Sequence, residues 1–403
     1  MPTIYRAGTV ADVRNRTLLA DQAIVVDEQR IVSVEPWRAT QASYTDLSDC
    51  LVAPGLIDLH THLIGDLDHG SNTPFLTKSA AWAALAGVKN AAATLRAGFT
   101  TVRDLGTFRA FIDCDLRDAI NDGTVIGPRM FTTGGFVTTS TGGGEITDLA
   151  LDIELPPEFR VGVADSADEV RRAVRTFIHG GADLIKIIAT GAGFAAGTVP
   201  GAAEYSEDEI RAAVTEAANY GKYVAAHAHG TEGALRAVRA GVRTLDHGSY
   251  IEGDEIFDAL LAHDTYYVPT TYLIHWLDAQ GSSSGFPEEA RRKVRAAVDL
   301  SMDALGEAVR RGVKIAYGTD AIIFPHGSNA LQMLDFEAVG MNGFDVLASA
   351  TINSAEALGS ADVGALEPGR FADFVAIRGA KSVDDIRVFQ QIDLVVKGGE
   401  MVV

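Results

Sequence analysis

The sequence predicts an α/β protein whose main body is a (β/α)8 barrel, of the TIM-barrel type. Short apolar segments with the composition of buried strands alternate with helical segments over most of the chain, and eight such strands favour a closed parallel barrel. An open doubly wound sheet would show the same alternation, but no Gly-x-Gly-x-x-Gly turn follows the first strand, so the barrel is favoured. The eight expected strands are 56–59, 99–103, 129–132, 184–188, 223–226, 243–245, 266–269 and 314–317.

Helices are expected between these strands. Two of them begin with a Ser-x-x-Glu capping box, at Ser166 and Ser206. In this motif the serine side chain accepts a hydrogen bond from the backbone of the first turn, and the glutamate returns one. The expected helices are 82–97, 111–121, 167–179, 207–220, 231–240, 255–262 and 288–311.

The two ends of the chain have a different pattern and predict a second, smaller domain. Residues 20–34 contain two apolar runs joined by a polar turn, which is typical of a hairpin. Residues 374–377 and 394–397 are similar apolar runs. We therefore expect a small β-sandwich domain from residues 1–54 plus 364–403, and a TIM-barrel domain over 55–363.

Composition excludes several classes of function. The chain has 403 residues, with 34 Lys plus Arg against 54 Asp plus Glu, for a net charge of −20. This balance disfavours nucleic acid or an anionic membrane as a partner. The two cysteines, Cys50 and Cys114, cannot build a disulfide framework or a thiolate metal cluster. Without a signal peptide pattern or an apolar run of about 18 residues, we expect a cytoplasmic enzyme.

Metal-ligating side chains lie in or directly after five of the eight expected strands. Barrel enzymes carry their reactive groups at these carboxyl ends. Two histidines of the first strand are two residues apart and therefore point to the same side. Imidazole and carboxylate suit zinc or another divalent first-row ion. The six candidate ligands are His60, His62, Lys186, His227, His247 and Asp320.

Lys186 has two interpretations that the residues alone leave open. A charged lysine inside a barrel is costly to bury, so it would pair with an acid or reach toward the mouth. Alternatively, CO2 adds to the neutral amine and creates a carbamate, whose oxygens can bridge two metal ions.

These motifs resemble the amidohydrolase superfamily, in the branch near imidazolonepropionase and the prolidase-like and arginine carboxypeptidase-like zinc enzymes. The resemblance covers nearly the whole chain and is more specific for the metal site than for the substrate. It is carried by 54–62 (PGLIDLHTH), 98–104 (GFTTVRD), 182–186 (ADLIK), 225–230 (AAHAHG), 318–321 (GTDA), 364–369 (GALEPG) and 372–375 (ADFV).

The resemblance implies a binuclear centre with two divalent metal ions, zinc being the expected one. His60, His62 and Asp320 would hold one ion and His227 and His247 the other, with a carboxylated Lys186 and a hydroxide between them. The hydroxide would attack an amide carbon, and Asp320 would pass its proton to the leaving amine. A small-molecule amide or peptide is the implied substrate, and a homo-oligomer the implied assembly.

Two further histidines are candidate substrate contacts. His229 lies two residues after His227, and the resemblance associates this position with a terminal carboxylate of the substrate. His326 follows the last strand, where a structural loop histidine is an equal alternative. We expect Arg103 and Asp104 to form an ion pair inside the barrel. The remaining histidines are expected to be ordinary surface or packing residues: His69, His179, His263 and His275.

One departure from the resemblance bears on the substrate. Relatives with peptidase activity carry a histidine in a loop after the third strand, where this chain has Gly144 within 141–145 (TGGGE). Thr141 or Glu145 could replace that donor, or the substrate could differ. The sequence therefore predicts a dipeptidase, carboxypeptidase or N-acyl amino acid hydrolase. The alternatives are a hydrolase of a non-peptide amide, lactam, carbamate or urea, and, remotely, an inactive metal-binding scaffold.

Overall fold

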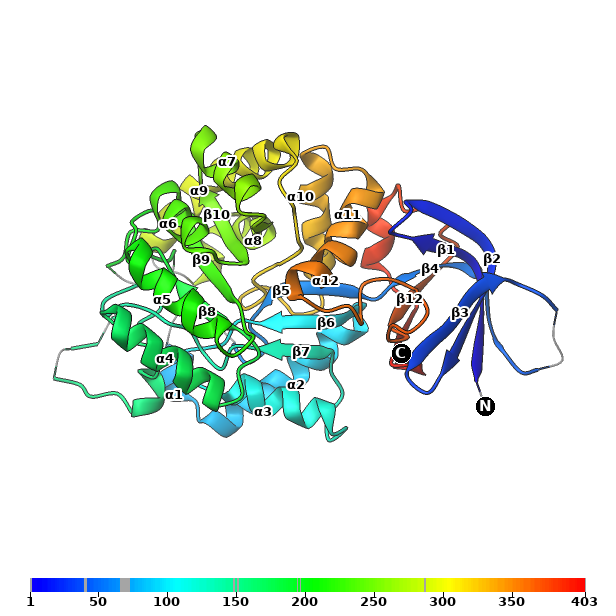
Figure 1. Cartoon of the computed structure of the whole chain (residues 1–403), viewed down its shortest axis with the longest axis horizontal. Helices are drawn as coiled ribbons and strands as arrows, with labels where there is room; N and C mark the ends of the chain where they lie inside the picture. Colours follow the sequence, from blue (N-terminus) through cyan, green and yellow to red (C-terminus); the bar gives the residue numbers. More distant parts are fainter. Residues whose placement is uncertain are drawn as a thin grey trace.

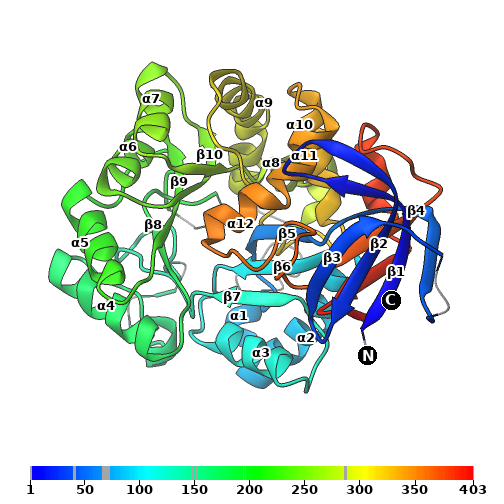
Figure 2. The same ribbon diagram turned by 45° about the vertical axis from the view of Figure 1, so that its right-hand side comes forward.

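The computed structural model describes residues 2–39, 42–65, 73–147, 149–150, 152–193, 195, 197–285 and 288–402. An α/β body and a sheet made from both ends of the chain lie side by side (Figure 1). Figure 2 shows the same division, with the helices outside the parallel strands and the terminal sheet at one edge. None of the described helices combines the length and the apolar character needed to cross a membrane.

The terminal sheet has seven strands in the order β14-β13-β12-β4-β1-β2-β3. The predicted hairpin is confirmed, because β2 and β3 pair antiparallel. The sheet buries its own apolar cluster, which includes Ile24, Val52 and Phe374. These strands form one hydrogen-bonded sheet, and the sandwich arrangement stays a prediction. The strands are β1 (Thr3–Asp12), β2 (Thr17–Asp27), β3 (Arg30–Pro36), β4 (Thr45–Pro54), β12 (Phe374–Arg378), β13 (Leu394–Lys397) and β14 (Glu400–Met401).

The body contains two parallel sheets, β5-β6-β7 and β8-β9-β10-β11. Single parallel bridges join them through Val137 and Ile187 on one side, and through Tyr267 with Ile315 and Thr61 with Ala321 on the other. The expected eighth strand is reduced to these bridges. The strands are β5 (Leu56–Thr61), β6 (Phe99–Asp104), β7 (Arg129–Thr132), β8 (Ile185–Ile188), β9 (Val224–Gly230), β10 (Thr244–Tyr250) and β11 (Tyr266–Val268).

The expected helices are present, and both serine caps accept the predicted bond from Glu169 or Glu209. The chain also forms helices that the sequence did not predict, at 73–77, 271–280, 333–338, 343–349 and 352–358. The α-helices are α1 (Thr73–Thr77), α2 (Ala80–Arg96), α3 (Ile112–Asn121), α4 (Ala167–His179), α5 (Glu207–Ala218), α6 (Thr231–Ala240), α7 (Asp254–Ala262), α8 (Thr271–Gln280), α9 (Glu288–Arg311), α10 (Met333–Ala338), α11 (Gly343–Ser349) and α12 (Ile352–Leu358). Short 3-10 helices span Pro157–Phe159, Gly281–Ser284, Asn329–Gln332 and Ile386–Gln390.

Candidate active site

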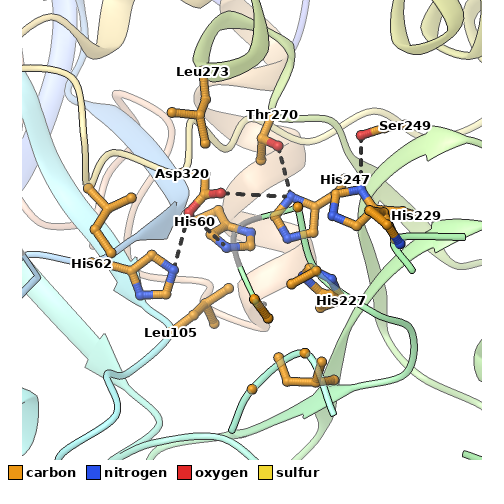
Figure 3. Close-up of a pocket in the computed structure, with 18 of the residues that line it drawn as sticks. His60, His62, Leu105, His227, His229, His247, Ser249, Thr270, Leu273 and Asp320 are labelled. Atoms are coloured by element: carbon orange, nitrogen blue, oxygen red, sulfur yellow. Dashed lines mark hydrogen bonds and ion pairs between the residues drawn. The ribbon is translucent and has the colours of Figure 1, made fainter. Parts of the chain in front are cut away.

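Three predicted ligands meet at the carboxyl ends of the parallel strands (Figure 3): His60 near the end of β5, His62 just after β5, and Asp320, directly before the bridged residue Ala321. His62 Nε2 lies 3.2 Å from Asp320 Oδ1, and His60 Nε2 lies 3.6 Å from the same oxygen. One ligand atom of each of the three residues falls within 4.8 Å of the other two. These three residues could therefore hold one cation.

Two more histidines stand beside this group. The rings of His227 and His247 have centroids 4.4 Å apart, and those of His247 and His60 are separated by 4.6 Å. His247 Nδ1 is 4.0 Å from Asp320 Oδ2, so the carboxylate faces both groups. His227 Nε2 is buried and has no hydrogen-bond partner among the described residues. An orphaned buried imidazole nitrogen is what an absent metal ion would leave.

Backbone geometry fixes these side chains. Buried Asp58 lies two residues before His60 and accepts hydrogen bonds from the backbone of His60, from Thr319 and from Asn329, which ties β5 to the loop before Asp320. His247 and Asp320 both adopt left-handed backbone, with φ of 74° and 56°. That conformation is costly for residues other than glycine and concentrates at functional sites.

Hydrogen bonds fix the orientation of two of these imidazole rings, those of His62 and His247. His62 Nδ1 donates to the carbonyl oxygen of Gly106 at 2.6 Å, and His247 Nδ1 lies 2.8 Å from Thr270 Oγ1. Such partners orient a metal-ligating histidine and leave its other nitrogen free. Nε2 of both rings is therefore the nitrogen available to a cation.

Asp246 is a site residue that the sequence analysis missed. Its Oδ2 lies 3.2 Å from Lys186 Nζ, 3.0 Å from His60 Nδ1 and 3.2 Å from Arg103. The expected partner of Arg103 was Asp104, which instead accepts bonds from the backbone of Leu63 and Gly106. That expectation was wrong because neighbouring residues of β6 point to opposite sides of the strand.

Burial sets the protonation states of the cluster. It lowers the pKa of His60 to about 4 and holds the pKa values of His227 and His247 well below the ordinary value for histidine. Burial also lowers the pKa of Lys186, and Arg103 adds to the effect while Asp246 opposes it. Burial opposes the ionisation of Asp320, but the neighbouring histidines hold its pKa at about 2. His62 differs, because burial lowers its pKa but the contact with Asp320 outweighs this and raises it above the ordinary value. The neutral imidazoles of His60, His227 and His247, with the ionised carboxylate of Asp320, are donors that fit a divalent cation.

The cluster forms the floor of a pocket whose walls are mostly apolar. His229 lines this pocket, and its Nδ1 lies 3.0 Å from Ser249 Oγ. His326 is not among the residues that line it, and both of its ring nitrogens are buried without a hydrogen-bond partner in the described part of the chain. The structure thus brings one of the two candidate substrate contacts to the pocket.

The other histidines lie away from this floor. His179 ends α4 and His263 follows α7, while His275 of α8 lies 3.0 Å from Asp335 of α10. His69 lies outside the described residues.

The glycine-rich loop forms part of the pocket wall through Gly143 and Gly144. A Cβ on Gly144 would lie 2.9 Å from Phe136 and Ile188, so the structure leaves no room for a side chain there. Thr141 and Glu145 do not line the pocket, because the Glu145 carboxylate accepts from the Thr141 backbone and pairs with Arg160. Neither residue replaces the missing histidine in this arrangement.

The chain is similar to proteins of known family and structure. Residues 51–402 match the model of the amidohydrolase family. The ochratoxinase of Aspergillus niger is 31% identical over 98% of this chain and 84% of its own length. Its crystal structure superposes with a TM-score of 0.87, at 30% identity over 99% of this chain and 95% of that chain.

Two solved peptidases are also similar. A Xaa-Pro dipeptidase with methionine bound in its active site gives a TM-score of 0.94 at 32% identity, covering 100% of this chain and 99% of that one. A prolidase in complex with N-methylphosphonate-L-proline gives 0.90 at 31% identity, with the same coverage. The chain therefore belongs to the amidohydrolase family and is a hydrolase that acts on carbon–nitrogen bonds.

Proposed function

We propose that this protein hydrolyses the amide bond of a small molecule at a binuclear metal centre in the mouth of a closed (β/α)8 barrel. The observation that carries the proposal is the convergence of six donors, far apart in sequence, on the floor of one pocket. We assign them as ligands: His60, His62, Lys186, His227, His247 and Asp320. Two divalent ions, zinc by preference, would supply Lewis acidity and a water of lowered pKa when bound.

Lys186 is the residue that would link the two halves of the centre. Its buried amine has a lowered pKa, and a neutral amine is the form that reacts with CO2. We therefore assign it as the site of a carbamate. Asp246 holds the amine 3.2 Å away and fixes its position beside His60.

Asp320 would act as the proton carrier. Its carboxylate is ionised and faces both histidine groups, so it can accept a proton at the reacting centre and deliver it to the leaving amine. His229 would contact a carboxylate of the substrate. Lys293 of α9 lines the same pocket and would add a positive charge near the mouth.

The favoured substrates are dipeptides and N-acyl amino acids, and among the relatives a Xaa-Pro dipeptidase and a prolidase support this assignment. A non-peptide amide, lactam, carbamate or urea is the second candidate. Two observations favour this second candidate. Phe136 and Ile188 leave no room at Gly144 for the histidine of the peptidases, and the chain is similar to an ochratoxinase. A homo-oligomeric state and a cytoplasmic location stay predictions.

The test is metal removal and restoration with a substrate panel. Protein dialysed against a chelator should lose hydrolysis of every amide in a panel of dipeptides, N-acyl amino acids, anilides and ureas. Adding back zinc, manganese or cobalt should restore it, with metal analysis giving two ions per chain. Turnover that survives complete metal removal would refute the metal dependence. A metal-loaded protein that hydrolyses no carbon–nitrogen bond would refute the proposal and favour the scaffold alternative.

A further inference from the structure

One wall of the pocket is a row of three phenylalanine rings. The ring centroids of Phe75 and Phe108 are 4.8 Å apart at 59°, and those of Phe108 and Phe136 are 5.5 Å apart at 84°. Phe75 belongs to α1, whereas the other two follow β6 and β7. All three line the pocket and are only partly buried, so apolar surface faces its interior.

Gly144 lines the pocket next to Phe136. The Phe136 ring packs so close to its α-carbon that an added Cβ would lie 2.9 Å from the ring, and equally close to Ile188. The absence of a side chain therefore lets an aromatic ring occupy this part of the wall. The wall offers no described charged side chain to a substrate beyond the histidine floor.

The wall across the pocket has a different character. It comes from α8 and α9, which follow β11, and it presents Leu273, Leu277 and Lys293. Leu105 and Leu273 lie on opposite sides of His60 in the view of Figure 3. Lys293 Nζ contacts Thr198 O at 2.9 Å and Glu289 at 3.1 Å. Apart from Lys186, it is the one lysine or arginine among the described residues that line the pocket.

The difference between the two walls predicts the orientation in which a substrate binds. In an N-acyl amino acid or dipeptide the free carboxylate is on the amine side of the scissile bond, and its charge is attracted to the lysine side of the pocket. The acyl side then faces the phenylalanine row. Offset and edge-to-face contacts with such rings favour an aromatic group beyond simple burial of area.

We propose that the row of Phe75, Phe108 and Phe136 is an acyl-side subsite for an aromatic group, so that the preferred substrates are N-aroyl amino acids. This inference rests on the proposed amide hydrolysis. It adds the side of the scissile bond on which the bulky aromatic group lies and the residues that select it.

The experiment compares kcat/KM for three substrates on the zinc-loaded enzyme: N-benzoyl-alanine, N-acetyl-alanine and N-acetyl-phenylalanine. We expect about tenfold or greater preference for benzoyl over acetyl, and a smaller gain from phenylalanine on the amine side. Phe108→Leu and Phe136→Leu should lower kcat/KM for N-benzoyl-alanine severalfold more than kcat/KM for N-acetyl-alanine, which reduces the benzoyl preference. Phe371→Leu is the matched control, because Phe371 is equally half-buried but lies outside the pocket and should preserve the preference.

Binding provides a second readout that does not need turnover. Calorimetry should show N-benzoyl-glycine binding more tightly than N-acetyl-glycine, with the difference reduced in Phe108→Leu, and thermal melts would establish that each variant is folded. If amides are hydrolysed but benzoyl and acetyl substrates are equivalent, or if folded wall variants slow both equally, the subsite is wrong although the enzyme class stands. If the binding difference is present but no amide is cleaved, the proposed function fails and the subsite remains.

Discussion

Lys186 and Asp246 form a buried pair, with Nζ and Oδ2 3.2 Å apart and both side chains at most 2% exposed. The same carboxylate also faces Arg103, whose side chain is fully buried. The Asp246 carboxylate therefore provides the counter-charge for the buried guanidinium of Arg103 and also contacts Lys186 and His60. A buried charge that loses its partner is strongly destabilising, whereas the complete network is tolerated.

Asp246→Asn should therefore destabilise the fold and weaken metal binding together. We expect a loss of about 3–5 kcal/mol in the free energy of unfolding, because Arg103 stays buried without a counter-charge. Urea titration would measure the loss, and metal analysis should find fewer bound ions. Asp278→Asn is the control, since its partner Arg295 is 72% exposed and their ion pair should contribute about 1 kcal/mol or less. Wild-type stability in Asp246→Asn would refute this account of the network.

Asp320→Asn tests the assignment of the proton carrier. Asparagine has the same size and keeps one oxygen but cannot accept the proton, so kcat should fall by about 10²–10⁴-fold with a smaller change in KM. Steady-state kinetics on any cleaved amide measures this, with Asp345→Asn, in an exposed ion pair with Arg16, as the control. A kcat within about threefold of the wild-type value would remove Asp320 from the chemistry.

Much of the strand and helix pattern followed from local rules. His60 and His62 share one side of β5 because strand side chains alternate, and Ser206 caps α5 because its glutamate lies three residues on. The hairpin of β2 and β3 was marked by a polar turn. These features depend on neighbours in sequence, so the sequence alone was enough to predict them.

Features that depend on tertiary packing were missed. α8 begins at Thr271 without a side-chain cap, so nothing local marked its start. Asp246 adjoins His247, and adjacent residues of a regular strand point to opposite sides. The left-handed backbone at His247 lets the side chains of Asp246 and His247 both face the site, and no sequence pattern predicts that conformation. Phe75, Phe108 and Phe136 have no common period and become a row only when α1 meets the loops after β6 and β7.

Substitution of Gly144 tests whether the loop position is closed. Gly144→His should not create an additional catalytic donor, because its Cβ would meet Phe136 and Ile188 at 2.9 Å. We expect a destabilisation of about 1–3 kcal/mol, typical of overpacking, and no gain in peptide hydrolysis. Gly193→Ala is the matched control, since nothing lies within 4 Å of its added Cβ in the same pocket. A stable Gly144→His variant with faster dipeptide turnover would show that Phe136 and Ile188 can move to admit the side chain.

The contact between α8 and α10 gives a pH dependence of stability. His275 Nδ1 lies 3.0 Å from Asp335 Oδ1, and this hydrogen bond raises the pKa of His275 above its ordinary value, against the opposing effect of burial. A raised folded pKa means that the pair stabilises the protein fully below the unfolded pKa of about 6.5. The contribution is lost as the pH rises through the folded pKa. His275→Gln should therefore be less stable than the wild type by about 1 kcal/mol or less at pH 5.5, with no difference at pH 9. Urea unfolding at the two pH values measures this, with His263→Gln at the exposed end of α7 as the control. An equal difference at both pH values would show that packing, and not the charge of His275, stabilises the contact.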